Sequence, residues 1–181
     1  MATTKRQLTR EKILNAAWHL FNQQGYQDTS TRQIARQAGV ADGTVFSHFP
    51  TKLEMLKAGI VAQVDRVLTE AEQQDPGGSP AERLLHYAGY LYGYYADNSE
   101  FSRELFKETI WQHAELQPQI EVFKQRLMAD RQDPAYAEIM IDCYFMTLLY
   151  GLNQRQPSAS RMLERLREKL ARLGEPNVVN A

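Results

Sequence analysis

Polar and basic side chains recur at short intervals between residues 31 and 52, in a pattern suited to binding nucleic acid. Hydroxyl, imidazole and cationic groups donate hydrogen bonds to phosphate oxygens and to base edges. A glycine among them would let the backbone approach DNA closely. The candidates for DNA contact are Thr31, Arg32, Asp42, Gly43, Thr44, Phe46, Ser47, His48 and Lys52.

Two short helices joined by a tight turn are expected to position these side chains. Ser30 and Gln33 form a capping box that starts the first helix at Thr31. Gly39 suits a helix C-cap with positive φ, and Pro50 ends the second helix. The second helix places its polar residues on one face and apolar residues on another. This arrangement is typical of a helix-turn-helix motif, whose second helix enters the DNA major groove.

The segment from Gly39 to Leu56, GVADGTVFSHFPTKLEML, resembles the signature of the tetracycline-repressor (TetR) family of bacterial transcriptional regulators. The resemblance extends back to Arg10 through EKILNAAWHLFNQQGYQDTSTRQIA. It implies a DNA-binding helix-turn-helix unit whose matching positions contact DNA. It also implies a helical body that binds a small molecule and pairs two chains through its last two helices.

Three residues depart from the family pattern within the motif. Ala41 stands where a capping residue is frequent, so the recognition helix is expected to start one residue later, on Asp42. The carboxylate of Asp42 is unfavourable beside phosphate unless it caps the helix or accepts from a cytosine amino group. Phe46 replaces the usual tyrosine and lacks a hydroxyl that could bond phosphate. These departures bear on which DNA sequence is preferred.

The charge of the chain is divided unevenly along its length. Residues 1–60 hold eight Lys/Arg and four Asp/Glu, and the remainder holds 13 and 18. A basic N-terminal part on an acidic body fits a DNA binder, although chance variation is the alternative.

The sequence contains no run of about 18 apolar residues, so no membrane span is predicted. With no visible signal peptide and a single cysteine, Cys143, a cytoplasmic protein is expected.

The sequence predicts an all-α fold of about nine helices in two domains. Residues 1–52 are expected to form the helix-turn-helix DNA-binding domain, and residues 53–181 a helical ligand-binding and dimerisation domain. Thr9 is expected to cap the first helix, after a mobile arm of residues 1–8. A long helix is expected from Thr51 to about Gln74, before the Pro/Gly-rich break at residues 75–80.

A tyrosine-rich helix over residues 80–96 indicates a small-molecule pocket in the second domain. Phenol hydroxyls could orient a ligand, while Gly89 and Gly93 open space beside them. Tightly packed helix contacts are the alternative. The expected ligand-binding residues are Tyr87, Tyr90, Leu91, Tyr94, Phe106, Trp111, Phe123, Asp142 and Tyr144.

The last two helices are expected to form a dimer interface. Residues 139–152 are apolar nearly all round, and such a helix is buried on all sides. The following helix carries leucines with the 3-4-3 spacing of a coiled-coil seam. Packing of that helix inside its own chain is the alternative. The expected interface residues are Phe145, Leu149, Leu163, Leu166, Leu170 and Leu173.

Together these patterns favour a dimeric DNA-binding transcriptional regulator. It would be a repressor, released from a palindromic operator in double-stranded DNA by a small-molecule effector. The alternative is a DNA-binding scaffold of the same fold, gated by a protein partner or not gated. An enzyme is not expected, since no Ser/His/Asp or Cys/His pairing and no phosphate-cradling glycine loop is present. Glu104 and Glu108 lie one turn apart, but no ligand set converges on them, so neither a metal nor a cofactor is expected.

Overall fold

The computed structural model describes residues 4–109, 117–128 and 133–174. Within these ranges the chain forms nine α-helices and no strand, which confirms the all-α class expected from the sequence. The helices are α1 (Lys5–Gln24), α2 (Thr31–Ala38), α3 (Asp42–His48), α4 (Lys52–Gln73), α5 (Pro80–Asp97), α6 (Ser99–Thr109), α7 (Gln117–Met128), α8 (Pro134–Leu152) and α9 (Ala159–Leu173).

The chain divides into two compact units, Met1–Asp65 and Arg66–Ala181, and α4 contributes residues to both. The functional division at residues 52 and 53 stays a prediction. None of the helices in the described ranges is both long and apolar enough to cross a membrane.

Helix α1 begins earlier than the sequence analysis expected. Thr4 caps it, accepting from the Gln7 backbone N–H at 3.2 Å, while the Gln7 side chain accepts from the Thr4 N–H at 2.7 Å. Thr9 lies inside the helix and donates its hydroxyl to the Lys5 carbonyl at 3.0 Å. Residues 5–8 are therefore helical, and the expected free arm was wrong in length. Thr4-x-x-Gln7 is itself a capping box one turn upstream of Thr9, and the reciprocal cap satisfies two backbone donors.

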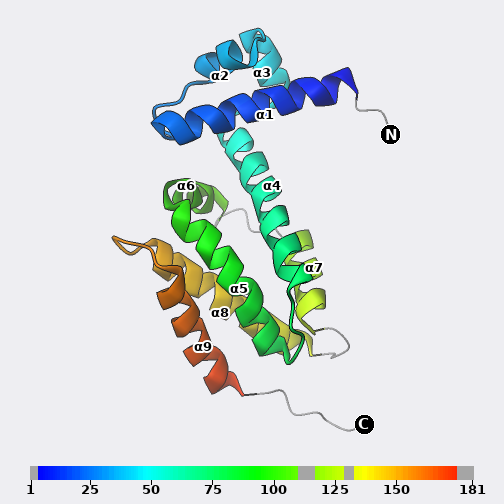
Figure 1. Ribbon diagram of the computed structural model, residues 1–181, viewed down its shortest axis with the longest axis vertical. Coiled ribbons are helices and arrows are strands. Elements are labelled where there is room, and N and C mark those ends of the chain that lie inside the picture. The colour runs from blue at the N-terminus through cyan, green and yellow to red at the C-terminus, as the bar shows by residue number, and fades with distance from the viewer. Residues whose placement is uncertain (1–3, 110–116, 129–132, 175–181) are drawn as a thin grey trace. The chain divides into compact units, whose positions relative to one another are not determined.

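The core of the first unit joins α1, α2, α3 and the first turns of α4. In Figure 1, α2 and α3 lie against one side of α1. The side chains of Ile13, Phe21, Ile34, Val45 and Leu56 are all but fully buried, and burying each contributes about 1.5–3 kcal/mol. Gly59 of α4 faces the Trp18 ring of α1, and a Cβ there would lie 2.9 Å from a ring carbon. This close approach requires a residue without a side chain.

In the second unit α5 packs against α6, α7, α8 and α9 (Figure 1). Ser79 and Glu82 form the capping box that the sequence predicts, with Pro80 in the first turn. Asp133 caps α8, and Ser158 caps α9, also as expected. Gly151 of α8 leaves space that the Met162 side chain of α9 fills. The two helices therefore pack closely at this point.

Candidate functional site

Helices α2 and α3 form the helix-turn-helix motif in the first unit. Ser30 caps α2 in a reciprocal capping box with Gln33, as the sequence predicts. Gly39 adopts φ 67°, ψ 37°, the left-handed conformation expected of it, and its N–H bonds the last turn of α2. Helix α3 starts at Asp42 after Ala41, which makes no side-chain cap, so the late start expected of the recognition helix is confirmed.

The recognition helix α3 buries one side and exposes the predicted DNA-contact residues on the other. Val45 is fully buried, whereas the Phe46 ring is 51% exposed. Asp42, Gly43 and Ser47 are exposed as well, and Thr44 and His48 are half-buried. The Ser47 hydroxyl donates to the Thr44 carbonyl at 2.8 Å, so its donor is already engaged within the helix.

Gly43 lies on the open side of α3. A Cβ built at this position meets no atom within 4 Å, so nothing within the described chain requires a glycine there. Thr31 and Arg32 occupy the first turn of α2, where free backbone N–H groups and the helix dipole favour an anion. The structure thus brings eight of the nine predicted DNA-contact residues to the exposed faces of α2 and α3.

An ion pair joins the two motif helices across their turn. The Arg32 Nε lies 3.4 Å from the Asp42 Oδ2, and the two side chains are 81% and 52% exposed. Sequence reasoning treated Asp42 as an unfavourable charge beside phosphate and missed this partner. The charges are opposite in sign, but only the folded turn brings residues ten positions apart together.

Lys52 departs from the outward placement expected of it. Its Nζ donates to the carbonyl oxygens of Tyr26, Gln27 and Thr29, at 2.6, 3.3 and 2.8 Å. The amine also lies 4.2 Å from the centroid of the Tyr26 ring, a cation–π distance. The ammonium group is therefore held by the turn between α1 and α2 and does not point outward, and its predicted contact with phosphate stays a prediction.

In the second unit three of the nine predicted ligand-binding residues, Tyr87, Phe123 and Tyr144, meet in one aromatic cluster. Tyr87 contacts Phe123 edge-on, with ring centroids 5.7 Å apart, and Phe123 lies 6.4 Å from the Tyr144 ring. Tyr144 stacks on Tyr92, whose hydroxyl donates to the Tyr144 carbonyl at 2.9 Å. The cluster is packed ring against ring, which is the alternative that the sequence left open beside a pocket.

The remaining ligand-binding predictions fall in different places. Leu91 is buried, and Phe106 packs edge-on against Tyr95 with centroids 5.5 Å apart. Trp111 lies outside the described residues. Asp142 is a correction, because it lies on the exposed side of α8 instead of the inward side. Its neighbour two positions on, Tyr144, points inward, and a helix turns about 100° per residue, so the two cannot share a face.

Tyr94 stands apart from the packed rings because of its hydroxyl group. This oxygen is buried, and it has no hydrogen-bond partner within the described part of the chain. Burial raises the pKa of Tyr94 to about 12, against the opposing influence of the Arg66 charge. A buried donor without an acceptor costs about 1–3 kcal/mol, so this hydroxyl is available to donate to a polar group of a ligand.

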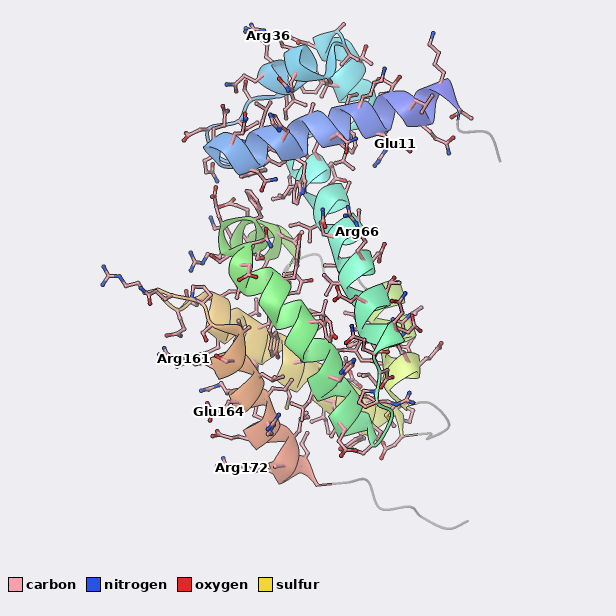
Figure 2. The ribbon with its side chains drawn as sticks, in the orientation of Figure 1. Glu11, Arg36, Arg66, Arg161, Glu164 and Arg172 are labelled. Atoms are coloured by element: carbon pink, nitrogen blue, oxygen red, sulfur yellow. The ribbon has the colours of Figure 1, made fainter. Side chains whose placement is uncertain are left out.

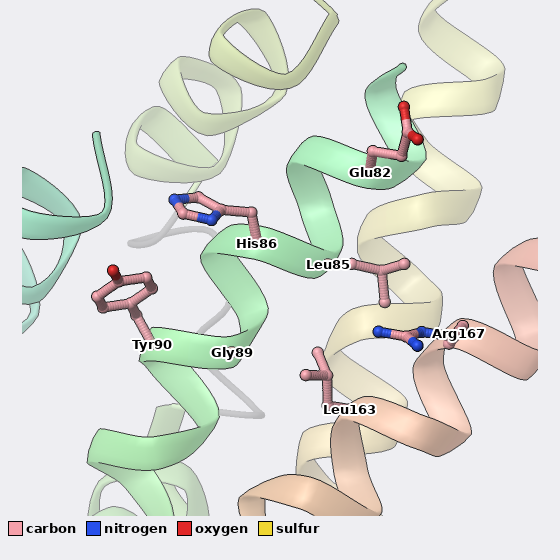
Figure 3. Close-up of a pocket in the computed structure, with 7 residues that line it drawn as sticks. All are labelled: Glu82, Leu85, His86, Gly89, Tyr90, Leu163 and Arg167. Atoms are coloured by element: carbon pink, nitrogen blue, oxygen red, sulfur yellow. The ribbon is translucent and has the colours of Figure 1, made fainter. Parts of the chain in front are cut away.

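A groove of about 680 Å³ runs between α5 and α9 (Figure 3). Leu163 and Arg167 of α9 lie beside Leu85 and Gly89 of α5 (Figure 3). Glu82, His86 and Tyr90 of α5 also line the groove, and the side chains of His86 and Tyr90 extend from the side of α5 away from α9. The His86 ring lies 5.3 Å from the Tyr90 ring and 5.5 Å from the Tyr87 ring, so it links Tyr90 to the aromatic cluster. Among the described residues, no group of three or more His, Cys, Asp or Glu side chains could hold a metal ion.

The leucine seam of α9 faces the interior of its own protomer. Leu166 is fully buried and Leu170 is 4% exposed, so neither can meet a second chain. Leu163 lines the groove, Phe145 and Leu149 are half-buried, and Leu173 is 37% exposed. For Leu166 and Leu170 the alternative of packing inside the chain is therefore observed, since α9 packs on α5 and α8. The interface role of the other four predicted residues stays a prediction.

Three exposed apolar residues of the second unit lie on the outer side of α8. Ile139, Met146 and Tyr150 are 45%, 59% and 51% exposed. Their spacing of seven and four residues places them on one stripe, called here the α8 stripe. The Arg165 guanidinium of α9 lies 4.1 Å from the Tyr150 ring centroid, and Figure 2 shows Arg161, Glu164 and Arg172 along the same helix.

Comparisons with known proteins agree on one family. Residues 13–58 match the family described as bacterial regulatory proteins, tetR family. The HTH-type transcriptional repressor KstR of Rhodococcus jostii is 32% identical over 75 residues, which cover 41% of this chain and 35% of KstR. The HTH-type transcriptional regulator SrpR of Pseudomonas putida is 46% identical over 55 residues, covering 30% of this chain and 26% of SrpR. The chain thus spans about a third or less of the length of these two relatives.

A solved structure extends the similarity beyond the motif. The crystal structure of Thermus thermophilus FadR, described as a TetR-family transcriptional repressor in complex with lauroyl-CoA, is 25% identical in sequence. It superposes with a TM-score of 0.65 over 95% of this chain and 96% of that chain. The likeness therefore includes the second unit.

Proposed function

Because the chain belongs to the TetR family of bacterial regulatory proteins, we propose that it is a dimeric transcriptional regulator. It acts as a repressor that binds a palindromic operator and is released by a small-molecule effector. The observation that carries the proposal is the exposed polar face of α3, held by a complete helix-turn-helix turn at Gly39. A protein with this function works in the cytoplasm, where the chromosome of a bacterium lies.

DNA binding is assigned to the two motif helices. Thr44, His48 and the Phe46 ring of α3 face the major groove, where polar groups meet base edges and an aromatic ring meets a thymine methyl group. Asp42, Gly43 and Ser47 complete this face. Thr31 and Arg32 contact phosphate at the N-terminus of α2, and Arg32 exchanges Asp42 for a phosphate oxygen on binding.

Dimerisation is assigned to the α8 stripe. An exposed run of Ile139, Met146 and Tyr150 on one helix is what a self-complementary interface between two helices requires. Asp142 lies within the same stripe, where its carboxylate can pair with a cation of the partner subunit. Two recognition helices held by such a dimer would lie roughly 34–36 Å apart, one turn of DNA.

The effector is assigned to the interior of the second unit beside Tyr94. Its buried hydroxyl without a partner gives a polar ligand group a hydrogen bond that the protein leaves unmade. The rings of Tyr95 and Phe106 extend from Tyr94 as a line of edge contacts and supply apolar surface for the ligand. That the Thermus thermophilus relative was crystallised with lauroyl-CoA supports a small-molecule effector for this fold.

One observation favours a second candidate function, a scaffold gated by a protein or not gated. The aromatic cluster is already packed ring against ring, so a ligand must displace side chains to enter. Fluorescence anisotropy of a labelled operator separates the two candidates. A small molecule that raises the melting temperature of the protein and releases the operator supports the effector; if no compound in a broad screen does either, the scaffold is favoured.

A further inference from the structure

We propose that Lys52 is a positioning residue that fixes the start of α2 relative to the end of α3 in the helix-turn-helix motif. This inference rests on the proposed function, because it assigns a role in DNA reading to a residue whose ammonium group is bound inside the first unit. Lys52 is the first residue of α4, directly beyond the recognition helix and its Pro50 stop. The carbonyls that it binds lie directly before α2, so one side chain joins the two ends of the motif.

The number of carbonyl acceptors around the Lys52 ammonium group matches its number of N–H donors. An ammonium group has three donors, and three carbonyl oxygens lie 2.6, 3.3 and 2.8 Å from the Lys52 nitrogen. These carbonyls belong to Tyr26, Gln27 and Thr29, whose sequence separations from Lys52 are 26, 25 and 23 residues. The charge also lies over the Tyr26 ring, which is itself packed 5.2 Å from Phe21 in the core.

The turn that Lys52 binds is organised to hold these carbonyls together. Gly25 ends α1 with φ 86° and sends the chain into the turn. Thr29 is 2% exposed, and its hydroxyl donates to the Gly25 carbonyl at 2.7 Å. The Thr29 N–H bonds the Tyr26 carbonyl at 3.3 Å, so that this oxygen accepts from both the backbone and Lys52. Converging carbonyl dipoles repel one another, and a cation at their centre offsets this repulsion.

The consequence for DNA reading follows from the position of the turn. Thr29 is joined directly to Ser30, the cap of α2, and Lys52 follows α3 by four residues. Fixing Thr29 against Lys52 therefore fixes the start of α2 relative to the end of α3. Arg32 in the first turn of α2 and Thr44 on α3 must reach one DNA duplex together, so their relative placement decides whether both contacts form.

The test replaces Lys52 by methionine, which keeps the aliphatic stem and removes the charge. Arg32→Met serves as the matched control, because Arg32 is an exposed cation of the same motif assigned to phosphate. For both variants, affinity is measured at several salt concentrations for a duplex selected with the wild-type protein and for an unrelated duplex. Backbone amide hydrogen exchange of residues 29–35 is measured in the absence of DNA.

For Lys52→Met we expect faster exchange at residues 29–35 and a fall of about tenfold or more in the ratio of selected to unrelated affinity, comparable to a mismatched base pair. The salt dependence should keep its slope, whereas Arg32→Met should lose about one unit of slope. A slope lost equally in both variants, or unchanged exchange in Lys52→Met, would overturn the proposal.

If Lys52→Met fails to fold, the proposal is tested on the wild-type protein by nuclear magnetic resonance. The quantity measured is the rate at which the protons of lysine ammonium groups exchange with water. The Lys52 N–H protons should exchange with water much more slowly than those of the exposed Lys5. Equal rates would contradict the proposal. This readout and amide exchange need no DNA, so they remain decisive even if the wild-type protein selects no operator and the proposed function fails.

Discussion

In Met1–Asp65 eight of the nine residues predicted to contact DNA are exposed or half-buried on α2 and α3, and none of these eight is fully buried. In Arg66–Ala181 six of the fourteen described residues predicted to bind a ligand or form the interface are buried. The Phe46 ring of the recognition helix is 51% exposed, while Tyr144 is 3% exposed and Leu166 fully buried. The first unit therefore offers a surface ready to bind, and the second unit must rearrange or use another face. The difference shows why one motif could be assigned from its spacing while the pocket and the interface could not.

The largest expected effect tests the inward position of the α9 seam. Leu166→Asp places a charge at a fully buried site, and we expect a loss of about 4 kcal/mol or more in unfolding free energy. Leu173→Asp, at a position 37% exposed on the same helix, should cost less than about 1 kcal/mol. Urea unfolding measures both. A folded, monomeric Leu166→Asp protein of wild-type stability would show instead that Leu166 lies in the dimer interface.

The second largest expected effect tests whether the α8 stripe of the second unit is the dimer interface. Met146→Glu introduces a charge into the α8 stripe, and we expect the dimer dissociation constant to rise about 100-fold or more. Val122→Glu on α7 is the matched control, because Val122 and Met146 are both apolar and both 59% exposed. Light scattering over a range of concentrations measures the assembly. If both variants dimerise alike, the α8 stripe is not the interface.

A pair of tyrosines tests the interior of the second unit. Tyr92→Phe removes a hydroxyl that donates to the Tyr144 carbonyl, and should lower stability by about 1 kcal/mol. Tyr94→Phe removes a buried hydroxyl without a partner, and should leave stability unchanged or raise it by up to about 1 kcal/mol. Thermal unfolding compares the two. A larger loss in Tyr94→Phe than in Tyr92→Phe would mean that the Tyr94 hydroxyl is bonded, and would remove the argument for a ligand group there.

The smallest effect tests the surface of the first unit. Asp42→Asn removes an acidic group from the DNA face and frees Arg32, so affinity for duplex DNA at low salt should rise roughly two- to fivefold. Glu11→Gln, an exposed carboxylate of α1 outside the motif, should change affinity less. Anisotropy titrations measure both. A fall in affinity in Asp42→Asn alone would show that Asp42 orients Arg32 or accepts from a base.

Local sequence patterns predicted the motif well because its signals lie within a few residues. Ser30 with Gln33, Gly39, and the start of α3 at Asp42 are each decided by backbone capping. The start of α1 was missed for the same kind of reason, since Thr4 offered a second cap that competed with Thr9. Helix ends can thus be read from sequence when a single cap is available.

Contacts between distant residues were not predictable in the same way. The Lys52 amine meets carbonyls more than twenty residues away, and backbone carbonyls carry no sequence signal. The spacing of Leu166 and Leu170 defines an apolar stripe, but spacing alone does not say whether the stripe meets its own chain or another. Asp142 was placed in the pocket because helix α8 is apolar nearly all round, and such a helix gives no direction for its few polar residues.

The most direct test of the central claim is selection of bound DNA from a random pool by the wild-type protein. The account predicts recovery of an inverted repeat whose half-site centres lie about 10 base pairs, or whole turns of DNA, apart. The Met146→Glu protein should recover the half-site without the repeat. A pool that shows no enrichment, or a wild-type site without two-fold symmetry, would contradict the claim that two copies of α3 read DNA together.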